Sequence, residues 1–268
     1  FWTKNAEPMM DKLKILDEKG FKYYFQFTIT AYQTDVEPGL KNKNRIIDTF
    51  KQLSNEIGKE KVIWRYDPIF LSDKYTIEFH EVWFEAMCKR LSGYTDKCVI
   101  SFMDLYAKTI KNTKALGIKK LNNDDICVIA SKLSCIAQKY NIEIETCSEN
   151  IDLTLYDINK GKCIDDKVIE QVLKSKIKVK KDDTQREVCG CVKSIDVGQY
   201  NTCKHFCKYC YANFNHAQVE ENCTLYDVNS PVLVGSLKGD EKITLREMKL
   251  IVCDTGGDQM NLKFTEDK

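Results

Sequence analysis

Three cysteines stand close together towards the carboxyl end of the sequence. Cys203, Cys207 and Cys210 are spaced C-x3-C-x2-C, and an aromatic residue, Tyr209, directly precedes the third. Iron–sulfur clusters are held by cysteine thiolates. A cluster of four irons needs four ligands, so a three-thiol loop leaves one iron open to a substrate or cofactor. The spacing therefore predicts a 4Fe-4S cluster bound by these three thiols.

A structural zinc ion is the alternative interpretation of the same loop. Two cysteines separated by three residues fall within the spacing of zinc fingers, but a structural zinc needs a fourth ligand. Nearby residues offer one: Cys189, Cys191, His205 or Cys223. The coincidence of three thiols with the aromatic residue favours the cluster.

Four other cysteines are predicted to form a second metal site. Cys147 ends a predicted strand, Cys163 lies in a predicted loop, and Gly190 lets the side chains of Cys189 and Cys191 approach one metal. Four thiols suit either a second iron–sulfur cluster or a zinc ion. Unconnected thiols are the simpler alternative.

Four further cysteines and one histidine, all in predicted helices or strands, are expected to have only packing roles. Free cysteine behaves as a small apolar residue when it is buried, and this is expected of Cys88, Cys98, Cys127 and Cys135. His80 lies in an amphipathic pattern and is interpreted as a residue on the flank of a helix.

Composition limits the classes of protein to which the chain can belong. The 268 residues include 13 cysteines, 4 prolines and 12 glycines, which does not resemble a small disulfide-stapled secreted module and favours the reducing cytoplasm. Lys and Arg total 41 against 40 Asp and Glu, so no overall charge attracts nucleic acid or an anionic membrane. Apolar runs stay far below the ~18 residues of a membrane helix, so no membrane partner is expected.

Successive strand–helix units are predicted to position the cysteines. β-rich runs alternate with segments of helical periodicity, which is typical of a parallel α/β sheet or barrel. The strands begin at residues 23, 62, 98 and 142, at nearly regular intervals. The predicted strands are Tyr23–Thr30, Val62–Tyr66, Cys98–Met103 and Ile142–Thr146, and helices are expected over 42–57, after Asp73, over 104–116 and from about Asn123. The stretch 174–183 is interpreted as a solvated linker, and 243–250 as an amphipathic stretch.

The cysteine loop resembles that of the radical S-adenosylmethionine (radical SAM) superfamily, which has this spacing and an aromatic residue at this place. The wider block, CGC followed by YNTCxxxCxYCYAN, is similar to an uncharacterised bacterial family, a domain of unknown function whose C-terminal cysteines are related to that loop. Phe1–Asn5, Trp64–Pro68 and Tyr226 with the turn 229–231 match the pattern of the same family. Spore photoproduct lyase is a more distant similarity.

The resemblance implies a radical-SAM-like fold, with one departure in the order of its parts. In the superfamily the cluster loop usually follows the first barrel strand, whereas here the strand–helix units come first. We therefore expect a partial or circularly permuted (β/α) barrel in which residues 187–197 supply the strand before the loop. Residues 1–184 would form the barrel core, lacking an N-terminal strand–helix segment, and 185–268 the cysteine-rich segment that completes it.

The resemblance also implies an activity. The chain would cleave S-adenosylmethionine reductively to a 5'-deoxyadenosyl radical that acts on an unknown small-molecule or nucleic-acid substrate, with ferredoxin or flavodoxin as electron donor. The alternative is a non-catalytic zinc or iron–sulfur protein of electron transfer.

Polar residues at the ends of the predicted strands are candidates for the site, because a barrel carries its site at the carboxyl ends of its strands. Arg65, Asp67 and Glu145 are the predicted catalytic residues: Arg65 suits a carboxylate and Glu145 a pair of ribose hydroxyls. The predicted cofactor-binding residues are Lys4, Asp104, Ser148 and Tyr209. Strand-end ion pairs and helix caps are the alternative roles.

Overall fold

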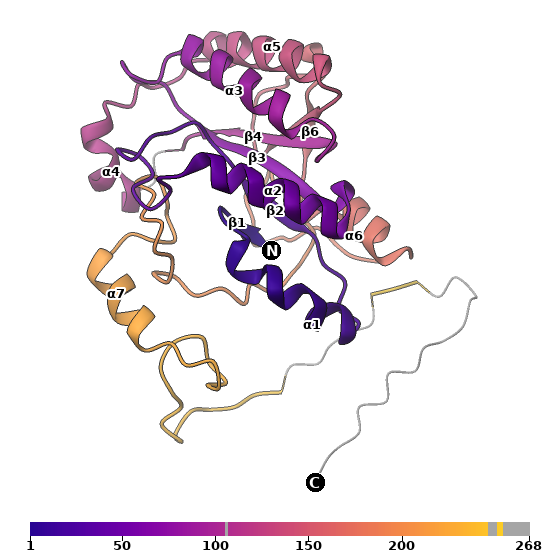
Figure 1. Cartoon of the computed structure of the whole chain (residues 1–268), viewed down its shortest axis with the longest axis vertical. Helices are drawn as coiled ribbons and strands as arrows, with labels where there is room; N and C mark the ends of the chain where they lie inside the picture. The colour runs from indigo at the N-terminus through magenta and orange to yellow at the C-terminus, as the bar shows by residue number, and fades with distance from the viewer. Residues whose placement is uncertain (105–106, 246–250, 254–268) are drawn as a thin grey trace.

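The computed structural model describes residues 1–104, 107–245 and 251–253, and it is an α/β structure (Figure 1). Its central feature is a parallel sheet of six strands. The strands are β1 (Trp2–Thr3), β2 (Phe25–Thr28), β3 (Val62–Ile69), β4 (Lys97–Phe102), β5 (Glu143–Cys147) and β6 (Asn159–Gly161). The helices are α1 (Leu13–Glu18), α2 (Lys43–Ile57), α3 (Ile77–Leu91), α4 (Ala107–Thr113), α5 (Asn123–Lys139), α6 (Asp166–Leu173) and α7 (His216–Thr224). Short 3-10 helices occupy Glu7–Lys12, Lys59–Lys61, Lys114–Leu116 and Thr154–Tyr156.

The strands lie in the sheet in the same order as in the sequence. Each strand pairs in parallel with the next, from β1 to β6. A doubly wound sheet reverses its strand order at a switch point, whereas the wall of a (β/α) barrel keeps the sequential order. Within the described residues β1 and β6 are the two edges of the sheet, so the observed sheet is a barrel-like wall that stays open.

The expected closing strand is absent from the part of the chain described. Residues 187–197 form no strand; their one ladder contact is an isolated antiparallel bridge between Lys181 and Val192. The prediction that this segment supplies the strand before the cysteine loop is therefore wrong. Its residues include Gly190 and alternate poorly in burial, and Gly within a strand weakens pairing.

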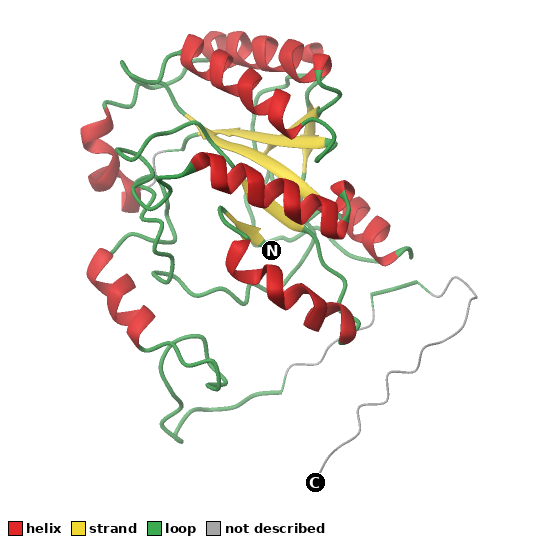
Figure 2. Cartoon of the chain, in the orientation of Figure 1, coloured by secondary structure: helices red, strands yellow, loops and turns green. Residues whose placement is uncertain are grey.

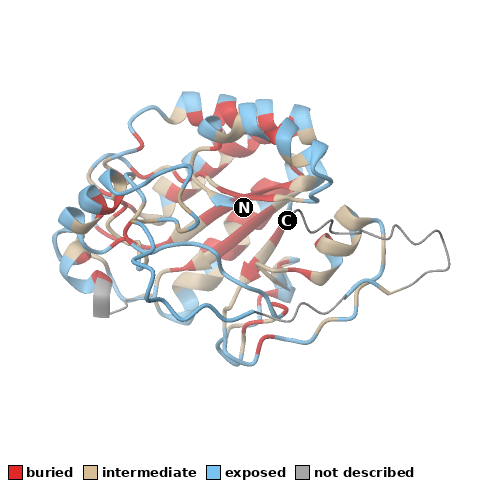
Figure 3. Ribbon diagram, turned by 90° about the horizontal axis from the view of Figure 1, so that it is seen from below, coloured by how far each residue is buried: buried red, intermediate tan, exposed pale blue. Residues whose placement is uncertain are grey.

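One face of the sheet carries the main apolar core. Phe25 and Phe27 alternate with Gln26, and Trp64 with Arg65, so that the aromatic side chains share one face. α2, α3 and α5 pack on this face through their own apolar stripes (Figure 2). Figure 3 shows the strands as the most continuously buried part of the molecule. Burying this face is what the helices contribute to the fold.

The helix α2 illustrates how the sequence sets these elements. Asn42 caps its first turn by accepting a hydrogen bond from the backbone N–H of Arg45. Ile46, Phe50 and Leu53 recur at helical spacing and are buried against the sheet. The helix ends at Ile57, and the φ of 97° at Gly58, which follows it, suits glycine.

The opposite face of the sheet is polar towards the carboxyl ends of the strands. Gln26, Arg65 and Asp67 lie on it, and only a small apolar cluster joins it to α6, through Val168 and Ile63. None of the described helices is long and apolar enough to cross a membrane. The polar face and its carboxyl edge are where a site would form.

Individual elements agree with the predicted ranges in part. Strands over 23–30, 62–66, 98–103 and 142–146 are confirmed as β2 to β5, with shifted ends, whereas α1, β6, α6 and α7 were missed. His80 is not a flank residue: it is buried and bonds to the hydroxyl of Tyr66 and the carbonyl oxygen of Phe70. Cys88 and Cys98 are buried as expected, but Cys127 is half-buried and Cys135 exposed. Residues 246–250 of the amphipathic stretch lie outside the described residues.

Candidate functional site

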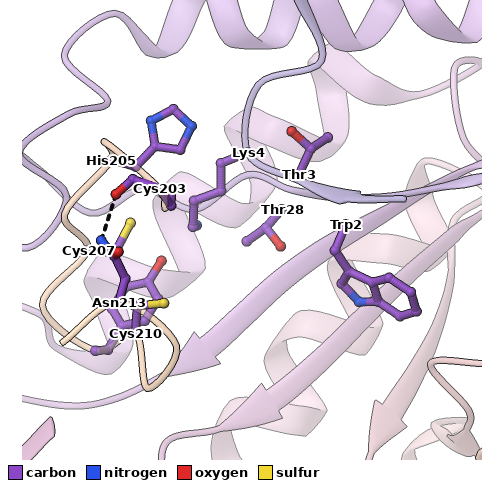
Figure 4. Close-up of a pocket in the computed structure, with 10 residues that line it drawn as sticks. Trp2, Thr3, Lys4, Thr28, Cys203, His205, Cys207, Cys210 and Asn213 are labelled. Carbon is purple, nitrogen blue, oxygen red and sulfur yellow. Dashed lines mark hydrogen bonds between the residues drawn. The ribbon is translucent and has the colours of Figure 1, made fainter. Parts of the chain in front are cut away.

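A pocket of about 270 Å³ lies at the carboxyl ends of β1 and β2, and the three-cysteine loop forms one of its walls (Figure 4). Thr3 ends β1 and Thr28 ends β2, so both strands point their last residues into it. The lining residues are Trp2, Thr3, Lys4, Thr28, Cys203, His205, Cys207, Tyr209, Cys210 and Asn213. The structure thus brings the three predicted cluster ligands to the predicted edge of the sheet.

The loop is fastened to the segment that follows β2. The N–H of Gly39 donates to the carbonyl oxygen of His205 at 2.9 Å, and the N–H of Lys208 donates to that of Val36 at 3.0 Å. A Cβ at position 39 would lie 2.6 Å from the Cα of His205, so only glycine allows this approach. Two backbone hydrogen bonds therefore fix the cysteine loop to the segment that follows β2.

A buried carboxylate lies beneath this contact. Glu37 accepts hydrogen bonds from Lys4 Nζ at 2.9 Å and Thr30 Oγ1 at 2.8 Å, and also from Lys43 Nζ and the hydroxyl of Tyr209. Burial alone would raise the pKa of Glu37, but the charges of Lys4 and Lys43 outweigh it and lower the pKa to about 2. Glu37 is therefore an anion that holds Lys4 at the pocket and Tyr209 in the loop.

Sequence reasoning missed Glu37, although a signal for it existed. It lies in the segment after β2, at the same edge of the sheet as the polar residues that were singled out. Glu149 was missed in the same way after β5, where it accepts a hydrogen bond from the N–H of Phe102 at 2.8 Å. Burial raises the pKa of Glu149 to about 7, which makes it a candidate proton donor or acceptor.

The three loop thiols differ in exposure, but burial raises the pKa of each of them. Cys203 is exposed, Cys210 half-buried and Cys207 buried. Burial raises the pKa of Cys207 to about 12, although Lys4 opposes the shift, and burial also raises the pKa of the other two. A metal would bind the thiolates and release these protons.

The three loop thiols line the pocket, and Asn213 beside them carries a buried acceptor without a partner. Among the described residues, no three His, Cys, Asp or Glu side chains are grouped so as to hold a metal ion. Asn213 donates from Nδ2 to the carbonyl oxygen of Cys203 at 2.7 Å, which fixes its Oδ1 as an acceptor. That oxygen is buried without a partner, a cost of about 1–3 kcal/mol unless a ligand supplies the donor.

The second cysteine set gathers on the polar face of the sheet. Cys147 ends β5, and its Sγ lies 2.7 Å from Sγ of Cys163, which follows β6. Cys191 is attached to the same place, because its Sγ accepts the N–H of Ile164 at 3.3 Å. Hydrogen bonding to Cys163, assisted by Arg65, lowers the pKa of Cys147 to about 6, and contact with Cys163 lowers that of Cys191 to about 5. Cys189 is buried on the same loop.

Two predicted catalytic residues belong to this second set and do not line the pocket. Arg65 donates from Nη1 to Cys163 Sγ at 3.2 Å, and its Nε lies 3.1 Å from both carboxylate oxygens of Asp67. The ion pair therefore holds the guanidinium against the thiols. Glu145 instead pairs at 2.6 Å with Lys97, the first residue of β4, at the amino end of that strand.

Of the four predicted cofactor-binding residues, two line the pocket and two do not. Lys4 and Tyr209 line the pocket, and Lys4 Nζ lies 5.3 Å from the centre of the Tyr209 ring.

Asp104 forms an exposed ion pair with Arg186 at 2.5 Å, which joins the sheet edge to the cysteine-rich segment. Ser148 has a φ of 56° and follows Cys147 directly. His205 lines the pocket, whereas the ring of His216 stacks on Phe206.

Comparison with known proteins places the chain in a family without assigning an activity. No curated protein matches it. Among solved structures, the complex of the virulence factor SghA with its substrate analog salicin is similar over 55% of this chain and 39% of that one, with 12% identity and a TM-score of 0.31. A likeness this weak carries no argument. A family model matches residues 1–212, which include the whole sheet and the three-cysteine loop, and the chain therefore belongs to the family described as "Domain of unknown function (DUF1848)".

Proposed function

We propose that this chain is a radical SAM-type iron–sulfur enzyme of the cytoplasm, whose sheet is a partial barrel of that type. One observation carries the proposal: Cys203, Cys207 and Cys210 line one pocket at the carboxyl ends of β1 and β2. Three thiols at such an edge leave a cluster iron free for a cofactor. When bound, the cluster and S-adenosylmethionine would supply reductive cleavage of the sulfonium and a radical that abstracts hydrogen.

The chain's own residues have distinct tasks in this proposal. The three thiolates would hold the cluster, and Lys4 would offset their negative charge, because its Nζ is held at the pocket by Glu37. Asn213 Oδ1 would accept a hydrogen bond from the bound cofactor, which is the donor that this buried atom lacks. Thr28 and Trp2 would line the side of the pocket away from the loop and limit the access of water.

A small molecule or a nucleotide of a damaged nucleic acid would have to reach the pocket past Trp2, whose side chain is half exposed. A small reduced carrier such as ferredoxin or flavodoxin would supply the electron through the exposed side of the loop at Cys203.

The test is anaerobic reconstitution of the purified chain with iron and sulfide. We expect a brown protein with the EPR spectrum of a reduced 4Fe-4S cluster, and release of 5'-deoxyadenosine and methionine from S-adenosylmethionine under a strong reductant. Cys207→Ala should abolish both, whereas Cys135→Ala should change neither, because Cys135 is exposed on α5. A colourless protein with one tightly bound zinc would refute the proposal and favour a structural site that recruits His205. A brown protein that leaves S-adenosylmethionine intact would favour electron transfer.

A further inference from the structure

Two thiols of the second cysteine set lie in direct contact on the polar face of the sheet. Cys147 Sγ and Cys163 Sγ are 2.7 Å apart. They come from different segments, because Cys147 ends β5 and Cys163 follows β6, and β5 pairs with β6 at Cys147 and Gly161. Sheet pairing therefore sets the distance between the two thiols.

This distance is nearer to that of a disulfide than to that between two ligands of one metal. Sulfurs at about 2.3 Å from a tetrahedral zinc lie about 3.8 Å from each other. A disulfide has its sulfurs about 2.05 Å apart. The observed 2.7 Å is well inside the first separation and needs only a small side-chain rotation to reach the second.

The surroundings of Cys163 hold it firmly in this position. Its carbonyl oxygen accepts hydrogen bonds from Tyr24 Oη and Gln26 Nε2, both at 3.1 Å. Arg65 donates to its sulfur at 3.2 Å, and Asp67 holds Arg65 in turn. Fixing both partners before they react lowers the entropic cost of forming a bond between them. Both cysteines are partly exposed as residues.

We propose that Cys147 and Cys163 form a redox-active dithiol that closes reversibly to a disulfide by exchange with a low-molecular-weight disulfide. The thiolate of one cysteine attacks the external disulfide and forms a mixed disulfide, which releases one external thiol. The second cysteine then attacks the protein sulfur of the mixed disulfide and releases the other external thiol. Two electrons pass from the dithiol to the external disulfide, and the two protein thiol protons leave with the released thiols.

Closing this bond would change the polar face next to the sheet edge. Arg65 would lose a thiol partner and keep Asp67 and Gln26, which leaves one guanidinium N–H free to bind another group. β5 would be joined covalently to the segment that begins α6. The oxidation state of this pair would thus set the polarity of the face independently of the three-cysteine loop.

The test uses the wild-type chain and oxidised glutathione. The fully reduced, anaerobically purified protein is equilibrated with glutathione buffers of increasing oxidised fraction, free thiols are alkylated, and peptides are mapped by mass spectrometry. We expect a linked peptide containing Cys147 and Cys163, formed in a single transition and fully reversed by excess reduced glutathione. Cys163→Ser should stop the reaction at the mixed disulfide and retain one glutathione at Cys147, whereas Cys135→Ser should behave like the wild type.

Three results would overturn the proposal. Alkylation of Cys147 and Cys163 as independent thiols across the whole series would show that they do not pair. Linkage of Cys189 to Cys191 in their place would assign the redox chemistry to another pair. Protection of all four thiols by one zinc or cluster equivalent, lifted only by a chelator, would make this set a metal centre. The experiment needs no cluster in the loop, so its outcome is separate from that of the proposed activity.

Discussion

The hydroxyl of Tyr209 donates a hydrogen bond to the buried carboxylate of Glu37, across 172 residues of sequence. Through this bond the aromatic residue of the cysteine motif contacts the anion that also holds Lys4 and Lys43. The aromatic position of the motif is thus part of the protein core as well as of the pocket wall.

Replacing Tyr209 with phenylalanine should loosen the loop without removing its packing. The substitution deletes the donor to a charged acceptor, and such a bond contributes about 1.5–3 kcal/mol. We expect Tyr209→Phe to lower the free energy of unfolding by that amount and to reduce cluster loading, measured by urea unfolding and by iron content. Tyr226→Phe is the control, because its side chain is exposed. An equal loss of stability and of iron content in both variants would show that the hydrogen bond between Tyr209 and Glu37 has no special role.

The titration of Glu37 should make the free energy of unfolding depend on pH in the acid range. Its pKa is about 2 in the folded chain against 4.5 without the fold, because Lys4 and Lys43 outweigh the effect of burial. The unfolded chain therefore binds more protons between these values, and the stabilisation is complete above about pH 4.5 and lost as pH falls towards 2. The contribution is roughly 3 kcal/mol.

The measurement is urea unfolding of the wild type and of Glu37→Gln from pH 7 to pH 2.5. The variant should be less stable at pH 7, because two lysines lose their anion, and its stability should fall less steeply below pH 4.5. A variant with the same slope as the wild type would contradict the assignment of this titration to Glu37.

The titration of His80 should add a second pH dependence of stability, at higher pH than that of Glu37. Burial lowers its pKa to about 4 from 6.5, so His80 is neutral in the fold and bonds to Tyr66 and Phe70 in that form. Since the unfolded chain takes up the proton first, stability should fall as pH decreases from 6.5 to about 4. In His80→Gln this slope should disappear. NMR titration of the imidazole gives an independent check, and a pKa near 6.5 would contradict the prediction.

Gly39→Ala should separate loop docking from the stability of the sheet. The added Cβ would meet backbone atoms of Lys204 and His205 at 2.6–2.8 Å, so the loop has to move. We expect a large loss of iron binding with little change in the unfolding of the sheet. Gly198→Ala is the matched control, since its Cβ meets only the side chain of Asp196. Normal iron content in Gly39→Ala would show that the loop is not held at this contact.

The sequence predicted the parts of the fold that have strong local signals. The strands β2 to β5 were found because aromatic and β-branched runs recur at regular intervals, and α2 because its apolar residues recur at helical spacing up to Gly58. β6 was missed because its sequence, Asn-Lys-Gly, has little strand propensity. Its strand state comes from pairing with β5, which is a tertiary effect.

The same distinction explains the site. The spacing of Cys203, Cys207 and Cys210 is local, and the structure brings all three to one pocket. Glu37 escaped notice because its importance depends on Lys4, Lys43 and Tyr209, which are distant from one another in sequence. The permuted strand over 187–197 was wrong because a fold pattern was extended to a segment whose own residues favour a loop.

The separation of Glu37 from Tyr209 in sequence also sets the order in which the parts of the site are synthesised. A ribosome adds about 5–20 residues per second, so roughly 10–30 s pass between the synthesis of the two residues. All six strands precede the cysteine loop in the chain, and a nascent polypeptide can complete the sheet, with the carboxylate already between its two lysines, before the loop emerges. The three loop thiols would thus be synthesised after the sheet edge against which they lie has folded.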